Sequence, residues 1–166
     1  MHSSRFAIAG VALVLLCGLL SAAGQTPGAF VPQPIVPGGQ IVALFPPTSK
    51  YLKKERIGEA EQNNLQKTVP GRIQSIVNIH NPSIEVHVVD PSNHTGAAVI
   101  VVPGGGHRTL NVGTEGADQV PFFYNYGVAT IILRSRLRQD GYVAETDAVY
   151  DGQQAVRIVR ARAKEW

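Results

Sequence analysis

Two nearly uninterrupted apolar runs stand out from the pattern of hydrophobic and polar positions along this chain. Residues 97–102 and 128–133 are rich in β-branched side chains. Such runs are typical of strands buried on both faces of a sheet, so we expect 97–102 to form a central strand and 128–133 another buried strand. Residues 83–90 alternate between apolar and polar positions, which predicts a half-buried strand. Together with residues 73–80 they predict a hairpin of outer strands.

Helical patterns follow both apolar runs. Residues 114–126 predict a helix capped by Thr114, although Pro121 removes an interior hydrogen bond and predicts a late start or a kink. Residues 147–166 predict a second helix with one apolar face. Strands that alternate with helices imply an α/β fold whose sheet is mainly parallel and covered on both sides. One more strand is expected after the second helix, so residues 71–166 correspond to the opening of such a domain.

The first 24 residues have the organisation of a secretory signal peptide: a short basic start, an apolar run, and small residues at 21–24. A retained transmembrane anchor is disfavoured because the apolar run is short for a membrane span. Residues 25–70 are rich in proline and glycine and then polar, which predicts an extended linker or a strap over the domain. We therefore expect a leader (1–24), a linker (25–70) and a truncated α/β domain (71–166). The mature protein would be secreted or periplasmic, with no stable membrane anchor.

The low net charge and the lack of clustered metal ligands disfavour several classes of function. The formal net charge is only +3, and no aromatic residues interleave with the basic cluster near the carboxyl end, so we expect no nucleic-acid partner. The single cysteine, Cys17, lies in the predicted leader. His80 and His87 fall in predicted outer strands without further clustered ligands, so we interpret them as sheet-surface histidines and expect no metal site.

A glycine-rich loop follows the first apolar run directly. Pro103 is succeeded by Gly104, Gly105, Gly106 and His107. In open α/β sheets ligands bind at the carboxyl ends of strands, and successive glycines can turn their N–H groups toward an anion or a developing oxyanion. This pattern indicates acyl-transfer chemistry.

Dinucleotide or nucleotide binding is the other function that a glycine loop after a strand can indicate. The dinucleotide fingerprint G-x-G-x-x-G requires a third glycine where this chain has Thr109, and an acidic residue where it has Arg134. The phosphate-binding Walker loop fails because no Gly-Lys-Ser/Thr follows. The sequence therefore favours the oxyanion interpretation, and we expect no cofactor.

Several segments, taken in order, resemble one enzyme family. They are the glycine loop at 102–107, Glu115-Gly116, Gly127-Val128-Ala129, Leu133-Arg134-Ser135-Arg136-Leu137, the helix at 147–166, and Asn81-Pro82-Ser83-Ile84-Glu85-Val86. This set is similar to the α/β-hydrolase carbohydrate esterases, the acetylxylan-esterase-like and feruloyl-esterase-like proteins with a PGGGY-type oxyanion loop. The resemblance covers residues 73–166, and it departs at His107, where the family has an aromatic residue, and at Ser135, where tyrosine is common.

The resemblance implies the amino-terminal part of an α/β-hydrolase three-layer sandwich, with a mainly parallel sheet and outer antiparallel strands. The implied reaction is the hydrolysis of carboxylic esters by a serine nucleophile, on acetyl or feruloyl groups of plant polysaccharide. Gly105 and Gly106 would supply oxyanion N–H groups, Gly104 the turn, and His107 part of the substrate pocket. The family's G-x-S-x-G nucleophile motif occurs nowhere in the 166 residues; it would be expected roughly ten to fifteen residues beyond Trp166. No catalytic triad residue is therefore assigned, and the chain by itself is expected to be inactive.

Some residues have competing interpretations. His107 could act as a general base, but no serine stands at a known spacing from it, so a pocket-lining role is favoured. Asp147 and Asp151 could be paired acids; the favoured interpretation is that they serve the helix dipole, with Asp151 paired to Arg136 or Arg157. For the whole chain, the alternative from another class is a non-catalytic exported binding module with a partial α/β-hydrolase fold.

Overall fold

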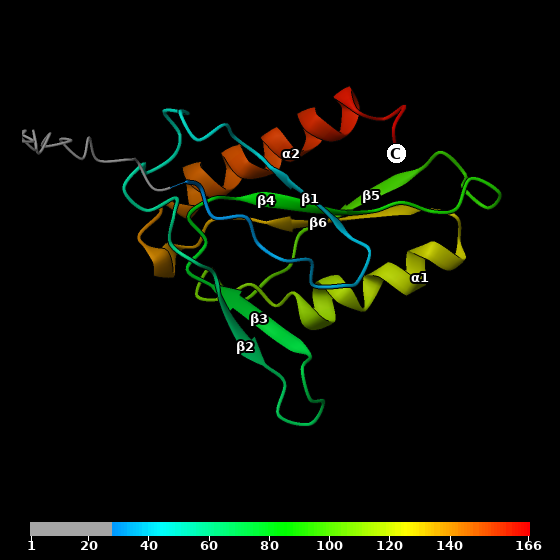
Figure 1. Ribbon diagram of the computed structural model, residues 1–166, viewed down its shortest axis with the longest axis horizontal. Helices are drawn as coiled ribbons and strands as arrows, with labels where there is room; N and C mark the ends of the chain where they lie inside the picture. Colours follow the sequence, from blue (N-terminus) through cyan, green and yellow to red (C-terminus); the bar gives the residue numbers. More distant parts are fainter. Residues whose placement is uncertain (1–27) are drawn as a thin grey trace, which may run out of the picture.

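The computed structural model describes residues 28–166, so the predicted leader and Cys17 lie outside the described residues. The protein has a mixed α/β fold built on a four-stranded sheet in the order β1-β4-β6-β5, with a separate two-stranded sheet of β2 and β3 (Figure 1). The elements are β1 (Gln40–Ala43), β2 (Gln62–Leu65), β3 (Ile73–Val77), β4 (Ser83–His87), β5 (Ala98–Val101), α1 (Gln119–Asn125), β6 (Ala129–Arg134) and α2 (Val149–Ala161). A short helical turn, Gly113–Ala117, precedes α1, and another, Ala144–Ala148, precedes α2. A third, Arg138–Asp140, follows β6.

The two helices lie on opposite faces of the larger sheet (Figure 1). On the α2 face, Ala155 packs into a core that includes Ile84 of β4 and Ile131 of β6. On the other face, Gly116 lies against the side chain of Ile132. A second apolar cluster lies away from this core and joins β3 to the segments after β5 and β6: Ile76, Ile79, Leu110, Val112 and Leu137.

The mainly parallel sheet predicted from the sequence is wrong for the described strands. Strand β4 pairs antiparallel with both β1 and β6, and only β5 and β6 form a parallel ladder among the described residues. The predicted hairpin is wrong as well, because β3 pairs with β2 whereas β4 lies inside the larger sheet. The alternating pattern of β4 was misleading: all five of its residues are buried, its polar ones included.

Strand β5 lies at an edge of the sheet rather than at its centre, which corrects the prediction for residues 97–102. Its residues are only partly buried, and Val102 just beyond it is 63% exposed. An apolar run of this kind is typical of a strand with neighbours on both sides. Beside β5 the described residues supply one neighbour, β6, so its other edge is open within this part of the chain.

A buried carboxylate inside the sheet binds the backbone of the described part of the predicted linker. Glu85 of β4, with no exposed side-chain surface, accepts hydrogen bonds from the backbone N–H groups of Ile35 and Val36 at 2.8 and 2.9 Å. It also pairs with Arg134 of β6 at 2.7 Å and with His87 at 2.8 Å. Burial raises the pKa of Glu85, but these hydrogen bonds outweigh it, so the pKa lies below its ordinary value.

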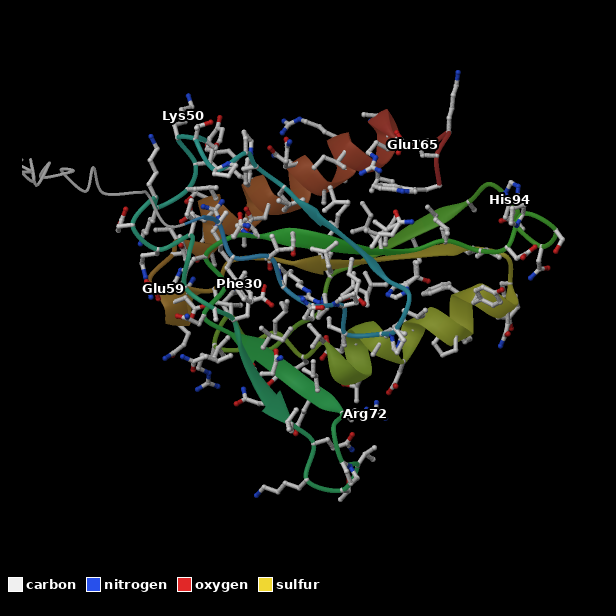
Figure 2. All side chains as sticks on the ribbon, viewed as in Figure 1. Phe30, Lys50, Glu59, Arg72, His94 and Glu165 are labelled. Atoms are coloured by element: carbon white, nitrogen blue, oxygen red, sulfur yellow. The ribbon has the colours of Figure 1, made fainter. Side chains whose placement is uncertain are left out.

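The same segment contributes apolar side chains to the core, which a free linker would not do. Leu44, Phe45, Leu52 and Ile57 are buried in the cluster under α2, and the N–H of Phe30 donates to the carbonyl of Ile57 at 2.7 Å. Residues 28–57, which we call the strap, thus pack against the domain, and Gln40–Ala43 within them forms the edge strand β1. Figure 2 labels Phe30 and Glu59 in the left half of the view.

Both predicted helices are present with shorter bounds. The predicted cap is wrong, because Thr114 lies inside the turn before α1 and no side chain caps that turn or α1. The α-helix α1 begins at Gln119, so Pro121 occupies its first turn, where a missing N–H leaves no helical hydrogen bond unmade. Helix α2 ends at Ala161, and Asp151 and Ala155 are its buried residues. None of the helices in residues 28–166 is long and apolar enough to cross a membrane.

Candidate active-site loop

The glycine loop begins where β5 ends and has a backbone that favours glycine. Gly105 has φ +134° and Gly106 has φ +63°, and His107 also has a positive φ of 56°. A Cβ atom at Gly105 would lie 2.1 Å from the carbonyl oxygen of Thr109. The sharp turn predicted from the sequence is thus present, and at Gly105 the fold has no room for a side chain.

Glu115, in the helical turn before α1, anchors the start of the loop. Its carboxylate accepts the N–H of Gly104 at 2.6 Å, and the amide of Asn111 donates to its other oxygen at 3.2 Å. The Asn111 N–H in turn donates to the Gly104 carbonyl at 2.9 Å. The hydrogen bond from Gly104 and that from Asn111 hold the pKa of Glu115 below its ordinary value. The Gly104 N–H is therefore already engaged.

The next two glycines have free backbone donors. Within residues 28–166 the N–H groups of Gly105 and Gly106 have no acceptor, whereas the carbonyl of Gly105 accepts the N–H of Arg108 at 3.2 Å. Two successive unengaged N–H groups in a turn are a suitable cradle for a negatively charged oxygen. The loop thus separates the roles of its glycines, with Gly104 held by protein and the following two available.

All four residues predicted for the site line one pocket of about 550 Å³. Gly104, Gly105, Gly106 and His107 form one wall, and the side chain of His107 is exposed. The rest of the lining is largely apolar and comes from the end of β6, the segment after it and the start of α2 with its preceding turn: Leu133, Ser135, Leu137, Arg138, Ala144, Glu145, Ala148, Val149 and Gly152. An apolar pocket beside backbone donors suits the acyl part of an ester together with its carbonyl oxygen.

We expect Glu115→Gln to loosen the loop without unfolding the domain, because a neutral amide oxygen is a weaker acceptor for the Gly104 N–H than a carboxylate. The Gly104 amide should exchange with solvent several-fold faster, measured by hydrogen exchange and NMR. Because the pKa of Glu115 is lowered, wild type should keep the anchor as the pH falls past the ordinary value of 4.5 and lose it only below the lowered pKa. An exchange rate in Glu115→Gln equal to that of wild type would contradict the anchoring role.

A buried ion pair fixes the segment that faces the loop. Arg136, just after β6, donates to Asp151 of α2 at 2.6 Å, and both side chains are at most 1% exposed. Arg136 also donates to the carbonyl of Tyr51 at 2.6 Å and contacts Asp147 at 3.3 Å. The predicted pairing of Asp151 with Arg136 is confirmed. It ties β6, α2 and the strap together beside the pocket.

His80 and His87 are not sheet-surface histidines, which corrects their interpretation: His80 lies between β3 and β4, and His87 is the last residue of β4. His80 is 1% exposed and bonds the Tyr142 hydroxyl and the Asn78 amide, each at 2.8 Å. His87 is 9% exposed and pairs with Glu85. Asn78 and Glu85 are two residues away from their histidines, whereas Tyr142 is 62 positions from His80 and could not be inferred from the local pattern. Within residues 28–166 there is no group of three or more histidine, cysteine, aspartate or glutamate side chains that could hold a metal ion.

Comparison with known proteins relates this arrangement to carbohydrate esterases. No family model matches the chain. The chain is 36% identical over 76 residues to an acetylxylan esterase of Xylanibacter ruminicola, a stretch that is 46% of this chain and 15% of that protein. An acetyl ester-xyloside bifunctional hydrolase from Caldicellulosiruptor lactoaceticus has a similar fold, with a TM-score of 0.50 and 19% identity over 78% of this chain and 39% of that one.

These likenesses support a relationship to hydrolases of the carbohydrate-esterase kind. The chain matches only a minor part of each relative's length. The structural likeness, at 19% identity, bears on the fold alone.

Proposed function

We propose that this chain is the amino-terminal part of an exported serine esterase with an α/β-hydrolase fold. It would act on carboxylic esters of plant polysaccharide, such as acetyl or feruloyl groups. The observation that carries the proposal is the pair of free N–H groups at Gly105 and Gly106 in a loop lining an apolar pocket. The likeness to an acetylxylan esterase supports the choice of substrate class. Export rests on the leader predicted at residues 1–24.

In this scheme the ester carbonyl lies against the glycine loop and the acyl group enters the apolar pocket. A serine hydroxyl attacks the carbonyl carbon, and the negative charge that develops on the carbonyl oxygen is stabilised by the N–H groups of Gly105 and Gly106. The alcohol leaves, and water then hydrolyses the acyl-enzyme. His107 lines the substrate pocket. The reaction needs no metal or organic cofactor in this scheme.

The serine must come from outside these 166 residues, since no G-x-S-x-G motif occurs among them. The purified 166-residue chain should therefore show no turnover of p-nitrophenyl acetate above the buffer rate. Reading the coding sequence beyond the Trp166 codon is the decisive experiment. The proposal expects an open frame with G-x-S-x-G, followed later by aspartate and histidine. Robust turnover by the 166-residue chain would contradict the assignment of the nucleophile.

The second candidate function is a non-catalytic exported binding module. The absence of G-x-S-x-G from this sequence favours it, as does a core that the described residues form among themselves. A stop codon directly after Trp166, together with a soluble product that melts cooperatively, would decide for the binding module.

A further inference from the structure

A second pocket, of about 380 Å³, is lined in part by sequence neighbours of residues in the glycine-loop pocket and differs from that pocket in chemistry. We name it the polar pocket. Val77 is its single apolar lining residue, and the others carry guanidinium, amide or carboxylate groups: Arg56, Gln62, Asn78, Arg108, Gln139 and Asp140. No aromatic ring lines it. Its walls thus offer hydrogen bonds and charge rather than a surface on which an apolar group could stack.

Half of these polar side chains are already engaged by the protein. Arg56 donates to Glu59 at 2.8 Å and to the Asp140 carbonyl at 2.9 Å, and its guanidinium lowers the pKa of Glu59 to about 2. The Asp140 carboxylate accepts the N–H of Ile79 at 2.8 Å. Asn78 donates to the Ala60 carbonyl at 2.9 Å. These contacts hold the three side chains in place. The Arg56 guanidinium is paired with Glu59, whereas one oxygen of the Asp140 carboxylate is hydrogen-bonded to a backbone N–H.

The remaining three polar side chains are available to a ligand. Within residues 28–166 the side chains of Arg108, Gln62 and Gln139 make no hydrogen bond or ion pair with protein, and all three are exposed. Arg108 thus supplies a positive charge without a partner in the described part of the chain. A guanidinium presents a planar fork that matches a carboxylate in two parallel hydrogen bonds, and amides pair well with hydroxyl groups.

Neighbouring residues of two segments line the two pockets. His107 lines the glycine-loop pocket, and its neighbour Arg108 lines the polar pocket. In the segment after β6, Arg138 lines the glycine-loop pocket and Gln139 lines the polar pocket. The N–H of Gln139 donates to the His107 carbonyl at 3.0 Å and joins the two segments. A chain-like ligand that crosses these two segments would place one unit in each pocket.

We propose that the polar pocket binds an acidic sugar unit, a uronate, of the polysaccharide whose ester group occupies the glycine-loop pocket. Arg108 binds the carboxylate, and Gln62 and Gln139 bind ring hydroxyls. The choice of a sugar rests on the proposed function. The choice of an acidic one rests on the unpartnered guanidinium and on the lack of an aromatic ring for stacking a neutral sugar.

Isothermal titration of the 166-residue chain with two xylo-oligosaccharides of equal length tests this, one carrying a single glucuronic acid and the other unsubstituted. The acidic ligand should bind about 10-fold or more tightly than the neutral one, as a charge-assisted bidentate pair provides. Arg108→Gln should abolish this preference, and Arg108→Lys should keep only part of it, because an ammonium lacks the fork. Raising the salt concentration should reduce the preference.

Arg157→Gln is the matched control, since Arg157 is also exposed, lies on α2, and has no partner within residues 28–166. It should leave the preference unchanged. Equal affinity for the two ligands, or a preference that survives in Arg108→Gln, would overturn the proposal. Because the readout is binding without turnover, a failure here leaves the esterase proposal standing. A coding sequence without G-x-S-x-G would overturn the esterase and leave the binding result intact.

Discussion

Replacing Asp151 with alanine is expected to lower the free energy of unfolding by about 3–5 kcal/mol, because it leaves a buried guanidinium without its carboxylate. Arg136 and Asp151 lie 2.6 Å apart, at 1% and 0% exposure. The carboxylate that remains, from Asp147, is 3.3 Å from the guanidinium and 28% exposed, so it is a weaker partner. The total stability of a small domain is about 5–15 kcal/mol, so the loss is a large fraction of it. Urea unfolding at neutral pH measures it.

Two variants separate the unpaired charge from lost packing. Asp147→Ala removes a weaker contact with the same arginine, at 3.3 Å and with a carboxylate that is 28% exposed, and should cost about 1 kcal/mol. The double variant Arg136→Met with Asp151→Leu should recover at least half of the loss, because both charges are removed together. A double variant as unstable as Asp151→Ala would show that the penalty does not come from the unpaired guanidinium.

Local pattern was sufficient where each element depends on its own residues. Strand β6 and helix α2 were predicted because an apolar run and a helical period indicate them without reference to the rest of the chain. The same kind of evidence failed for β4. Its glutamate and histidine alternate with apolar residues, as on a strand with one face in solvent. Glu85 is nevertheless buried, because it pairs with Arg134, which is 49 positions away in the sequence. A contact at that separation leaves no trace in the local pattern.

The sequence left a linker and a strap as alternatives for residues 25–70, and it could not decide between them for a related reason. Proline and glycine between residues 28 and 47 exclude a regular period, so the segment has no pattern of its own. It is held from outside, by the carboxylate of Glu85 on the N–H groups of Ile35 and Val36. Burial of Leu44 and Phe45 then adds apolar surface to the core. Only the folded sheet, which brings these partners together, determines that this segment packs.

The glycine loop was the most predictable part of the candidate site. A loop at the carboxyl end of β5 follows from the proline and three glycines after an apolar run. The division of roles within it does not, because it depends on Glu115 accepting the Gly104 N–H. Similarly, the sequence could not show that Arg108 lines a pocket with Gln62 and Gln139, since these residues come from three separate segments.

At Gly105 the backbone conformation and the surrounding space both exclude a side chain. Its φ of +134° is rarely adopted by L-residues, and a Cβ would lie 2.1 Å from the Thr109 carbonyl oxygen and 3.0 Å from the Thr109 methyl group. The nearest obstacle is backbone, which can yield only if the loop rearranges. Gly106, with φ +63°, has nothing within 4 Å of the same position. The two glycines therefore form a matched pair that differs mainly in the space available.

Replacing Gly105 with alanine should lower the free energy of unfolding by about 3 kcal/mol through backbone strain and the clash with Thr109. Gly106→Ala should cost about 1 kcal/mol, since a left-handed alanine is strained but fits. Urea unfolding gives both values. Amide NMR shifts should change from Arg108 to Asn111 in Gly105→Ala and stay nearly constant in Gly106→Ala. Equal losses in the two variants would mean that the approach of Thr109 does not determine the loop. A large loss at Gly105 would show that the turn presenting the two free N–H groups is set by that contact.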